Sequence, residues 1–274
     1  MSAQFEDAIE LIIRPKRFLY YGKKQKNEIT FAIQNQRNLT ITGIYCPAIE
    51  PLPRKACVIA LHGNGGNYDM MVYLNKYFSN NRVAFCTFDF SGCGRSQGDY
   101  ISLGYYEKDD VISVMDFLRE RYQIEDFGLY GYSMGAATAL RVLAERPEIK
   151  GAVLDSPYSS ILGFLGKFMY PPKSQSKKEF FEEIRKEVQE RAHFDIHDNV
   201  IDIADKIHQP VYFIHGENDK LVPPVMSELL LEKCSSEQKF RITFDGDHNS
   251  FRPFSIESIA INFLLDQFGA PHVS

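Results

Sequence analysis

Short apolar runs that alternate with stretches of helical spacing are the feature that most constrains how this chain folds. The runs are CVIAL (57–61), RVAFCTFDF (82–90), FGLYG (127–131), IKGAVLDSP (149–157) and PVYFIHGEND (210–219). Such continuous runs are typical of strands that are buried on both faces of a parallel sheet. The stretches between them, such as YYEKDDVISVMDFLRERY (105–122), gather apolar residues on one face of a helix. This alternation predicts an α/β protein with a mostly parallel central sheet flanked by helices.

Two segments depart from the alternation. Residues 28–46 alternate apolar and polar side chains around a polar centre, which predicts a β-hairpin that turns near residues 35–38. Residues 156–206 contain an apolar piece, ILGFLGKFMYPP, and a charged helix, KSQSKKEFFEEIRKEVQERAHF. We interpret residues 156–206 as a helical cap inserted over the sheet of a single domain spanning residues 1–274. The alternative is a pair of surface helices with no role at any site.

Composition excludes several classes of function. The net charge of −5 makes a nucleic-acid partner unexpected, because phosphate binding rests on clustered Lys and Arg. No apolar run approaches the length of a membrane span, and the start MSAQFEDAIE lacks the features of a signal peptide. The five cysteines are odd in number and widely spread, so we expect reduced thiols and a cytoplasmic protein.

Ser133 is the candidate nucleophile. In GLYGYSMGAA (128–137) a predicted strand ends and a predicted helix begins within a few residues. Such a turn strains the serine backbone and lifts its hydroxyl out of the sheet, and Gly131 and Gly135 avoid collisions with neighbouring elements. The N–H groups at the helix start carry partial positive charge, which suits a developing oxyanion. The alternative is a Gly/Ser turn of no consequence.

A serine hydroxyl needs a neighbouring imidazole to take its proton. His248 is the candidate base, because FDGDHNSF (244–251) is a polar, glycine-containing loop between the last strand and the last helix. The other histidines end buried strands before a glycine, lie in or beside the cap, or belong to the C-terminal tail; they are His62 and His215, then His193, His197 and His208, then His272.

The base needs an acid that holds its tautomer and offsets the imidazolium charge. Asp219 ends the strand in IHGENDKLVPP (214–224), and Glu217 is its nearest competitor. We prefer Asp219 because it lies further along the loop, just before the LVPP segment that would turn the chain into the next helix. The chain order is then Ser, Asp, His. The alternative for Asp219 is a turn or helix-capping role.

The oxyanion hole requires two backbone N–H donors. One is expected at Met134, the residue after the nucleophile, and the other in HGNGGN (62–67), after the strand CVIAL. We select Asn64 as the second donor, with Gly65 as the alternative.

Five motifs together carry a resemblance to a known family. LHGNGGN, FDFSGCGRSQGDY, GYSMGAATAL, HGENDKLVP and GDHNS resemble, in order and spacing, the α/β-hydrolase superfamily, and more narrowly its serine aminopeptidase S33-like or bem46-like serine hydrolases. The match runs from about residue 27 to residue 268. The resemblance implies the α/β-hydrolase fold, a Ser133–Asp219–His248 triad and a cap that shapes the substrate pocket. Family members hydrolyse esters, thioesters, amides and lipids.

We therefore expect a serine hydrolase that cleaves a carboxylic ester through an acyl-enzyme, with no metal or organic cofactor. The expected partner is a small-molecule or lipid acyl substrate. An acyl-thioesterase or a peptidase is the alternative within the enzyme class, and a catalytically silent hydrolase-fold receptor is the alternative outside it. In the cap, five apolar residues either line an acyl pocket or form a core that never meets substrate; they are Phe164, Leu165, Phe168, Met169 and Tyr170.

Other motifs favour structural roles. In SGCGRSQG (91–98), Gly98 lies one residue too far for a dinucleotide fingerprint, so we expect Asp89 and Ser96 to bond local backbone. His193 and His197 stand at i, i+4 spacing, but a solvated cap face is favoured over a metal site. The amphipathic start FEDAIELIIRPKRFLYY (5–21) is favoured to pack against the hydrolase body rather than on a membrane.

Overall fold

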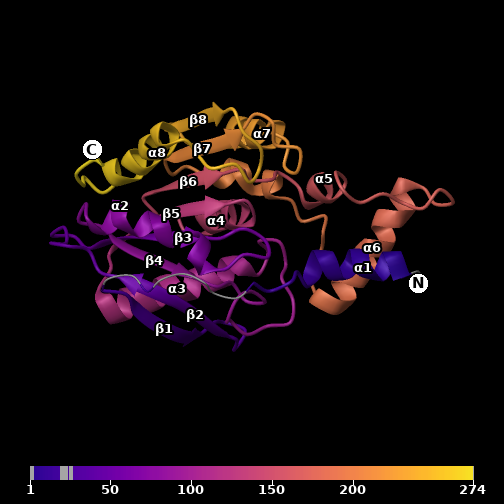
Figure 1. The fold of residues 1–274 in the computed structure, drawn as a ribbon, viewed down its shortest axis with the longest axis horizontal. Helices are drawn as coiled ribbons and strands as arrows, with labels where there is room; N and C mark the ends of the chain where they lie inside the picture. Colours follow the sequence, from indigo (N-terminus) through magenta and orange to yellow (C-terminus); the bar gives the residue numbers. More distant parts are fainter. Residues whose placement is uncertain (1–2, 19–23, 25–26, 274) are drawn as a thin grey trace.

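A computed structural model describes residues 3–18, 24 and 27–273 of the chain, and its centre is an eight-stranded sheet (Figure 1). The strands lie in the order β1-β2-β4-β3-β5-β6-β7-β8. They are β1 (Ile29–Gln34), β2 (Thr40–Cys46), β3 (Ala56–Leu61), β4 (Ala84–Phe88), β5 (Asp126–Tyr132), β6 (Gly151–Asp155), β7 (Val211–Gly216) and β8 (Lys239–Phe244). Only the β1–β2 and β2–β4 pairs are antiparallel. The mostly parallel sheet predicted from the sequence is therefore confirmed.

The predicted hairpin is also present. β1 pairs with β2 from Ile29↔Tyr45 to Gln34↔Thr40. The turn is closed by the Asn35 side chain, whose oxygen accepts the backbone N–H groups of Arg37 and Leu39 at 2.9 Å each. Such side-chain-to-backbone bonds are the reason that asparagine favours turns.

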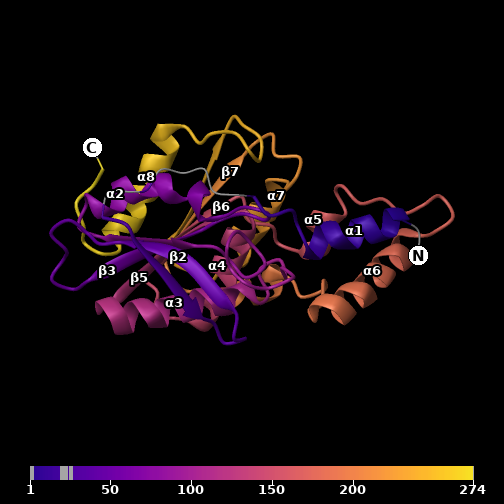
Figure 2. The same ribbon diagram turned by 60° about the horizontal axis from the view of Figure 1, so that its bottom comes forward.

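Helices cover both faces of the sheet (Figure 2). They are α2 (Asn75–Ser79), α3 (Glu107–Tyr122), α4 (Met134–Glu145), α7 (Val225–Lys233) and α8 (Phe254–Asp266). Every residue of β3 is buried, with alternate side chains in two separate cores: Ile59 packs on the side of α3 and α4, and Val58 on the side of α2 and α8. Burial on both faces explains why these strands read as continuous apolar runs.

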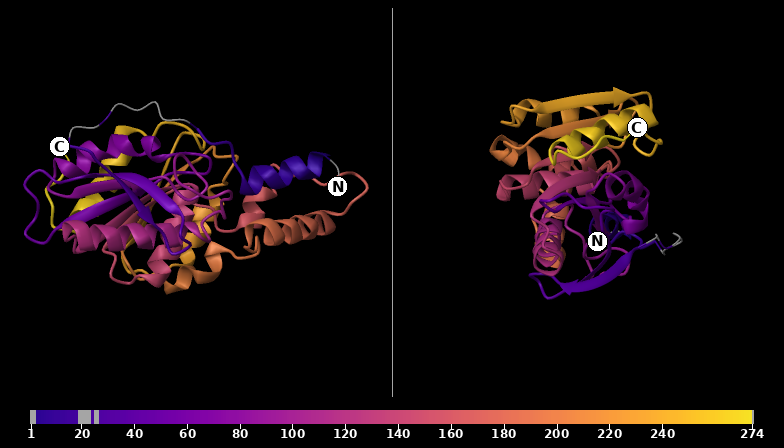
Figure 3. Two further views of the ribbon diagram at one scale, coloured as in Figure 1. Left: turned by 90° about the horizontal axis from the view of Figure 1, so that it is seen from below. Right: turned by 90° about the vertical axis from the view of Figure 1, so that its left-hand side faces the viewer.

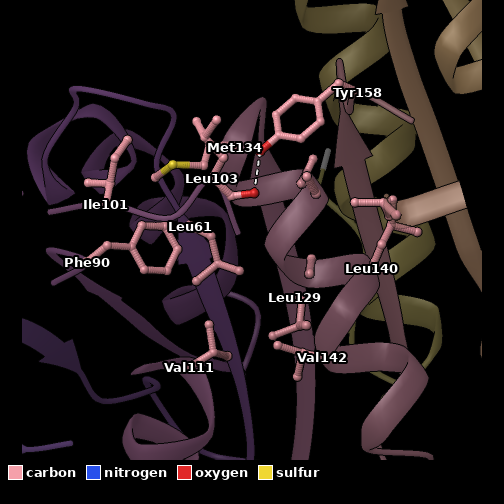
Figure 4. Packing of buried hydrophobic residues seen from close by; sticks show 14 of the residues in the cluster. Leu61, Phe90, Ile101, Leu103, Val111, Leu129, Met134, Leu140, Val142 and Tyr158 are labelled. Carbon is pink, nitrogen blue, oxygen red and sulfur yellow. Dashed lines mark hydrogen bonds between the residues drawn. The ribbon is translucent and has the colours of Figure 1, made fainter. Parts of the chain in front are cut away.

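The first of these cores lies directly beneath the turn at Ser133. Figure 4 shows Leu129 of β5 beside Val142 of α4 in this core, with Leu61 of β3 on the same side of α4. The hydroxyl of Tyr158 donates a hydrogen bond of 2.7 Å to the Leu103 carbonyl across the top of this core. The turn that carries Ser133 is thus supported by close-packed apolar side chains.

The segment after β3 differs from the helix that its apolar spacing suggested. It forms two 3-10 turns, η1 (Tyr68–Met70) and η2 (Val72–Leu74), before the short α2. Asn67 caps the first turn by accepting the Asp69 N–H, and the Tyr68 N–H donates to the Asp89 carboxylate at 2.8 Å. These local bonds compete with the regular i→i−4 pattern of an α-helix.

Three helices project from one end of the molecule (Figure 3). They are α1 (Ala3–Ile13), α5 (Ile161–Leu165) and α6 (Lys177–Ala192). A further 3-10 segment, η3 (Val200–Lys206), returns the chain to β7.

α1 lies along α6, where Phe5 meets Phe180 edge-to-face and Arg191 pairs with Glu6. The expectation that the segment 5–21 packs on the hydrolase body is confirmed at two of its residues: the Ile101 N–H donates to the Ile13 carbonyl at 2.8 Å, and the Arg17 guanidinium donates to the Ser96 carbonyl at 2.8 Å. Residues 19–21 of this segment lie outside the described residues. Across the described residues, no helix combines the length and the apolar character that crossing a membrane requires.

Candidate active site

The backbone at Ser133 is strained in the way that the sequence predicted. β5 ends at Tyr132, Ser133 has φ 53° and ψ −113°, and α4 begins at Met134. A Cβ atom at Gly131 would lie 2.5 Å from the Gly135 carbonyl oxygen, and one at Gly135 would lie 2.2 Å from the Leu61 carbonyl oxygen. Only glycine fits these two positions, so strand and helix can meet closely enough to hold the serine at the tip of the turn.

Ser133, His248 and Asp219 come together at the carboxyl edge of the sheet. The Nε2 atom of His248 lies 3.0 Å from the Ser133 Oγ, and its Nδ1 atom lies 2.6 Å from the Asp219 Oδ2. Their side chains arrive from three places: the β5–α4 turn, the loop after β7 and the loop after β8. All three residues are buried. Glu217, the competing acid, instead accepts a hydrogen bond from the Thr243 hydroxyl at an exposed position.

Asp219 is held as a charged acceptor. Its Oδ1 accepts the backbone N–H groups of Leu221 and Val222 at 3.0 and 2.7 Å. Burial raises the pKa of the Asp219 carboxyl, but hydrogen bonds from His215 and His248 outweigh burial and hold that pKa well below its usual range. A carboxylate facing Nδ1 fixes the proton of His248 there, which leaves the Nε2 lone pair directed at the serine hydroxyl.

His215 is a part of the site that the sequence analysis did not identify. Its Nε2 lies 2.8 Å from the Val222 carbonyl and 3.3 Å from the Asp219 Oδ2, and its Nδ1 lies 2.9 Å from the Ser227 hydroxyl. The carbonyl can only accept, so Nε2 carries the proton. His215 therefore holds the loop of Asp219 in place through its contacts with the Val222 carbonyl and the Asp219 carboxylate.

Tyr132 and Arg252 anchor the backbone of His248, although no sequence pattern pointed to either residue. Both donate to the His248 carbonyl, the tyrosine hydroxyl at 2.9 Å and the guanidinium Nη1 at 3.0 Å. Arg252 also makes a bidentate pair with Asp155, at the end of β6, with both distances 2.7 Å. This pair ties the loop of the imidazole to the rigid sheet edge.

The two predicted oxyanion donors border the same site. Met134 opens α4, and Asn64 lines the cavity in front of Ser133, as does Gly65. Within the part of the chain that the structure describes, the backbone N–H groups of these three residues have no hydrogen-bond acceptor. The N–H groups of Asn64 and of its alternative Gly65 are thus both available to an oxyanion.

A cavity of about 470 Å³ opens in front of Ser133 and His248. Three residues named in the sequence as acyl-pocket candidates line it, namely Phe164, Leu165 and Phe168. Met169 and Tyr170 instead line a second cavity of about 330 Å³ between α1 and α6, which the first cavity meets at Leu11 and Phe168. The contribution of α1 to the wall was not anticipated.

The remaining motifs have local roles. The Asp89 carboxylate accepts the N–H groups of Tyr68 and Arg95 at 2.8 Å each, and the Ser96 hydroxyl donates to the Asp89 carbonyl at 2.7 Å, so the predicted turn role of SGCGRSQG is confirmed. In the segment with His193 and His197, both oxygens of Asp195 are bound by Arg185, at 2.8 and 2.7 Å.

His62 is expected to make the protein less stable in acid. Burial lowers the pKa of its imidazole to about 4, while Nδ1 bonds the Gly63 carbonyl and Nε2 accepts the Phe90 N–H. In the unfolded chain the pKa of this imidazole is about 6.5. Between that pH and about 4 only the unfolded chain binds the proton, so the free energy of unfolding falls as the pH falls, by about 3 kcal/mol in total.

The free energy of unfolding in urea, measured for the wild type and for His62→Gln between about pH 7 and about pH 4.5, tests this effect. Glutamine can make both hydrogen bonds without titrating. Asp89 and Asp110, whose pKa values burial raises to about 6, act in the opposite direction but are present in both proteins. Parallel pH profiles for the two proteins would contradict the assignment of a neutral His62.

Residues 57–182 match the family model described as alpha/beta hydrolase fold. YqkD of Bacillus subtilis, an uncharacterized protein, is 26% identical over 238 residues, which cover 82% of this chain and 74% of YqkD.

Among solved structures, the esterase Pf2001 of Pyrococcus furiosus is 22% identical with a TM-score of 0.74, over 94% of this chain and 98% of that one. Est1E of Butyrivibrio proteoclasticus, solved with ferulic acid bound, is 18% identical with a TM-score of 0.70, over 87% of this chain and 99% of that one. At these identities the likeness shows the fold alone, and it confirms the predicted fold class.

Proposed function

We propose that this chain, which has the α/β-hydrolase fold, is a serine hydrolase that cleaves carboxylic esters. The observation that carries the proposal is the hydrogen-bonded series from Asp219 through His248 to Ser133, at 2.6 and 3.0 Å, at the edge of an apolar cavity. A buried carboxylate, an oriented imidazole and a strained serine form the arrangement that activates a hydroxyl at neutral pH.

In the proposed reaction the Ser133 Oγ attacks the ester carbonyl carbon while the His248 Nε2 takes the hydroxyl proton. Asp219 stabilises the imidazolium, and the N–H groups of Met134 and of Asn64 or Gly65 bind the oxyanion. Collapse expels the alcohol, which receives the proton from His248. Water, deprotonated by the same Nε2, then attacks the acyl-enzyme and releases the acid together with Ser133.

The charges in the cavity favour an ester over a peptide with a free amino terminus. Among the described residues that line the cavity in front of Ser133, Lys16 is the single Lys or Arg and there is no Asp or Glu. An aminopeptidase needs a carboxylate to bind the ammonium group of its substrate. The rest of the wall is mostly apolar, which suits an acyl chain. The narrower likeness to serine aminopeptidase S33-like or bem46-like proteins is therefore proposed as kinship and not as peptidase activity.

The reaction is tested with an ester, a thioester and an amide of the same acid, for example the butyrates of one aromatic alcohol, thiol and amine. The ester is expected to have the highest kcat/KM. A higher kcat/KM for the thioester, or for the amide, would replace carboxylester hydrolysis by one of the alternative reactions. An absence of turnover with all three would favour the silent receptor.

We further propose that residues 156–206 act as the cap of a single hydrolase domain, and that α1 belongs to it. The support is the shared wall of the two cavities, to which α1 contributes Leu11 and the residues after α5 contribute Phe168.

All five cysteines are buried free thiols, which supports the reducing cytoplasm as the compartment.

Leu11 is expected to set the length of the acyl chain. A chain too long for the cavity at Ser133 would pass between Leu11 and Phe168 into the cavity between α1 and α6. In Leu11→Trp the indole would fill this passage, so kcat/KM for p-nitrophenyl decanoate should fall tenfold or more. This is about the factor by which apolar pockets discriminate between substrates of different size. The effect on p-nitrophenyl butyrate should be smaller.

The control is Leu229→Trp, which places the same side chain on α7 at a similarly exposed leucine. Leu11→Trp and Leu229→Trp with the same chain-length profile would argue against acyl binding at α1.

A further inference from the structure

Lys16 is the one cationic side chain, among the described residues, in the wall of the cavity in front of Ser133. The rest of this wall is mostly apolar and includes neither Asp nor Glu within the described part of the chain. The proposed reaction moves protons between Ser133, His248 and water, and it uses no ammonium group. Lys16 is therefore a charged group at the site that the reaction leaves without a role.

The ammonium group of Lys16 has no partner among the residues that the structure describes. It makes no hydrogen bond and no ion pair with any of them, and the residue is exposed. The nearby cation Arg14 is instead neutralised by Glu10, at 3.3 Å on the same helical turn. Since Lys16 is both exposed and part of the cavity wall, a molecule bound in front of Ser133 can contact its ammonium group.

The backbone places Lys16 beside the loop of the candidate oxyanion donors. A Cβ atom at Gly65 would lie 3.9 Å from the Lys16 carbonyl oxygen and 3.6 Å from the Pro15 Cβ. Pro15 restricts the backbone on one side of Lys16. On the other side, the Arg17 guanidinium donates to the Ser96 carbonyl at 2.8 Å. Lys16 is thus held close to the place where the proposed reaction binds the ester carbonyl.

The charge of Lys16 selects the kind of substrate. A single cation in an otherwise uncharged and mostly apolar wall favours a molecule with an apolar body and one negative charge. The ammonium group has three donors and no acceptor, so it binds carboxylate oxygens. Solvent and salt screen such an exposed charge, so the expected preference for an anion is moderate.

We propose that Lys16 binds the carboxylate of an anionic ester, so that the substrate class is an ester that carries one carboxylate on an apolar body. This inference rests on the proposed ester hydrolysis and deepens it. The carboxylate belongs either to the acid portion, as in the half-ester of a dicarboxylic acid, or to the alcohol portion. Both sources present the same chemistry to the ammonium group.

The test compares two pairs of esters, and in each pair a carboxylate is replaced by a neutral carboxamide of similar size. In p-nitrophenyl hemiadipate and p-nitrophenyl adipamate the replaced group lies on the acid portion. In 4-carboxyphenyl butyrate and 4-carbamoylphenyl butyrate it lies on the alcohol portion. The measured quantity is the ratio of kcat/KM for the charged ester to kcat/KM for the neutral one, which cancels any effect of a variant on both.

Lys16→Met should lower this ratio about fivefold in one of the two pairs, the size expected of one ion pair at a solvated site. Lys16→Glu should lower it further, because like charges repel. Raising the NaCl concentration from about 0.05 M to about 0.5 M should lower the ratio of the wild type but not that of Lys16→Met. The control Lys178→Met removes an exposed lysine of α6 that lines neither the cavity in front of Ser133 nor the one between α1 and α6, and it should keep the ratio.

The two pairs distinguish the sources of the carboxylate. A fall confined to the first pair assigns it to the acid portion, and a fall confined to the second pair assigns it to the alcohol portion. An unchanged ratio in both pairs would make Lys16 a solvated surface lysine only. An equal fall in both pairs would indicate a field that attracts any anion without a binding position. Either of these two results overturns the inference.

Binding separates the failure of this inference from the failure of the proposed function. A wild type that hydrolyses none of the four esters would refute the proposed ester hydrolysis. The affinities of the hemiadipate and adipamate esters are then measured by ligand-observed NMR, with Ser133→Ala and with the double variant Ser133→Ala/Lys16→Met. A preference for the hemiadipate that falls about fivefold in the double variant would support the role of Lys16 without any turnover, and equal preferences in the two proteins would contradict it.

Discussion

Ser133→Ala is expected to lower kcat for ester hydrolysis by about 10⁵–10⁶-fold, and His248→Ala by a similar factor. The two side chains act as one unit, since the Ser133 hydroxyl is unreactive until the His248 Nε2, 3.0 Å away, takes its proton. The double variant should therefore be about as slow as either single variant. The measurement is kcat for p-nitrophenyl butyrate, with circular dichroism to verify folding.

The chain offers a matched control for the histidine. His272 also pairs with an aspartate, Asp266, at 2.5 Å, but on the exposed surface. His272→Ala should retain full activity. Oxyanion binding alone sustains only a small residual rate. A Ser133→Ala variant that keeps more than about 1% of wild-type kcat, far above that rate, would contradict the proposed role of the serine.

Asp219→Asn is expected to lower kcat by about 10⁴-fold while the fold is retained. The Oδ1 atom must still accept the N–H groups of Leu221 and Val222, so the new amide NH₂ would replace Oδ2. It would then face the Nδ1 of His248 and force the proton of the imidazole to Nε2, where it can no longer accept from Ser133.

The effect should be specific to this carboxylate. Asp266→Asn, the same change in the exposed pair with His272, should leave kcat unaltered. An Asp219→Asn protein within about tenfold of wild type would indicate that the His248 tautomer is fixed by something other than Asp219.

The fold and the central part of the site were predictable because their signals are local. β3 and β5 read as continuous apolar runs because both of their faces are covered. The turn at Ser133 was recognisable because Gly131 and Gly135 are required by close contacts within the same few residues. The order of strands then brought the loops of Asp219 and His248 to the same sheet edge.

The supporting residues were not predictable, because their roles depend on contacts between distant parts of the chain. Arg252 gains its role from Asp155, 97 positions earlier, and α1 gains its place from α6 through the pair of Arg191 with Glu6, 185 positions apart. Apolar spacing indicates that a helix buries one face, but it does not indicate which partner covers that face. His215 is a similar case, since a strand-end histidine carries no sign of a neighbouring carboxylate.

Reaction of the folded protein with a fluorophosphonate probe, followed by peptide mass analysis, tests most directly whether the imidazole at 248 activates the hydroxyl at 133. The account predicts a single phosphonylated residue, Ser133, with no labelling of Ser133→Ala and strongly reduced labelling of His248→Ala. Labelling that is absent from the folded wild type, or that persists undiminished in Ser133→Ala, would contradict it.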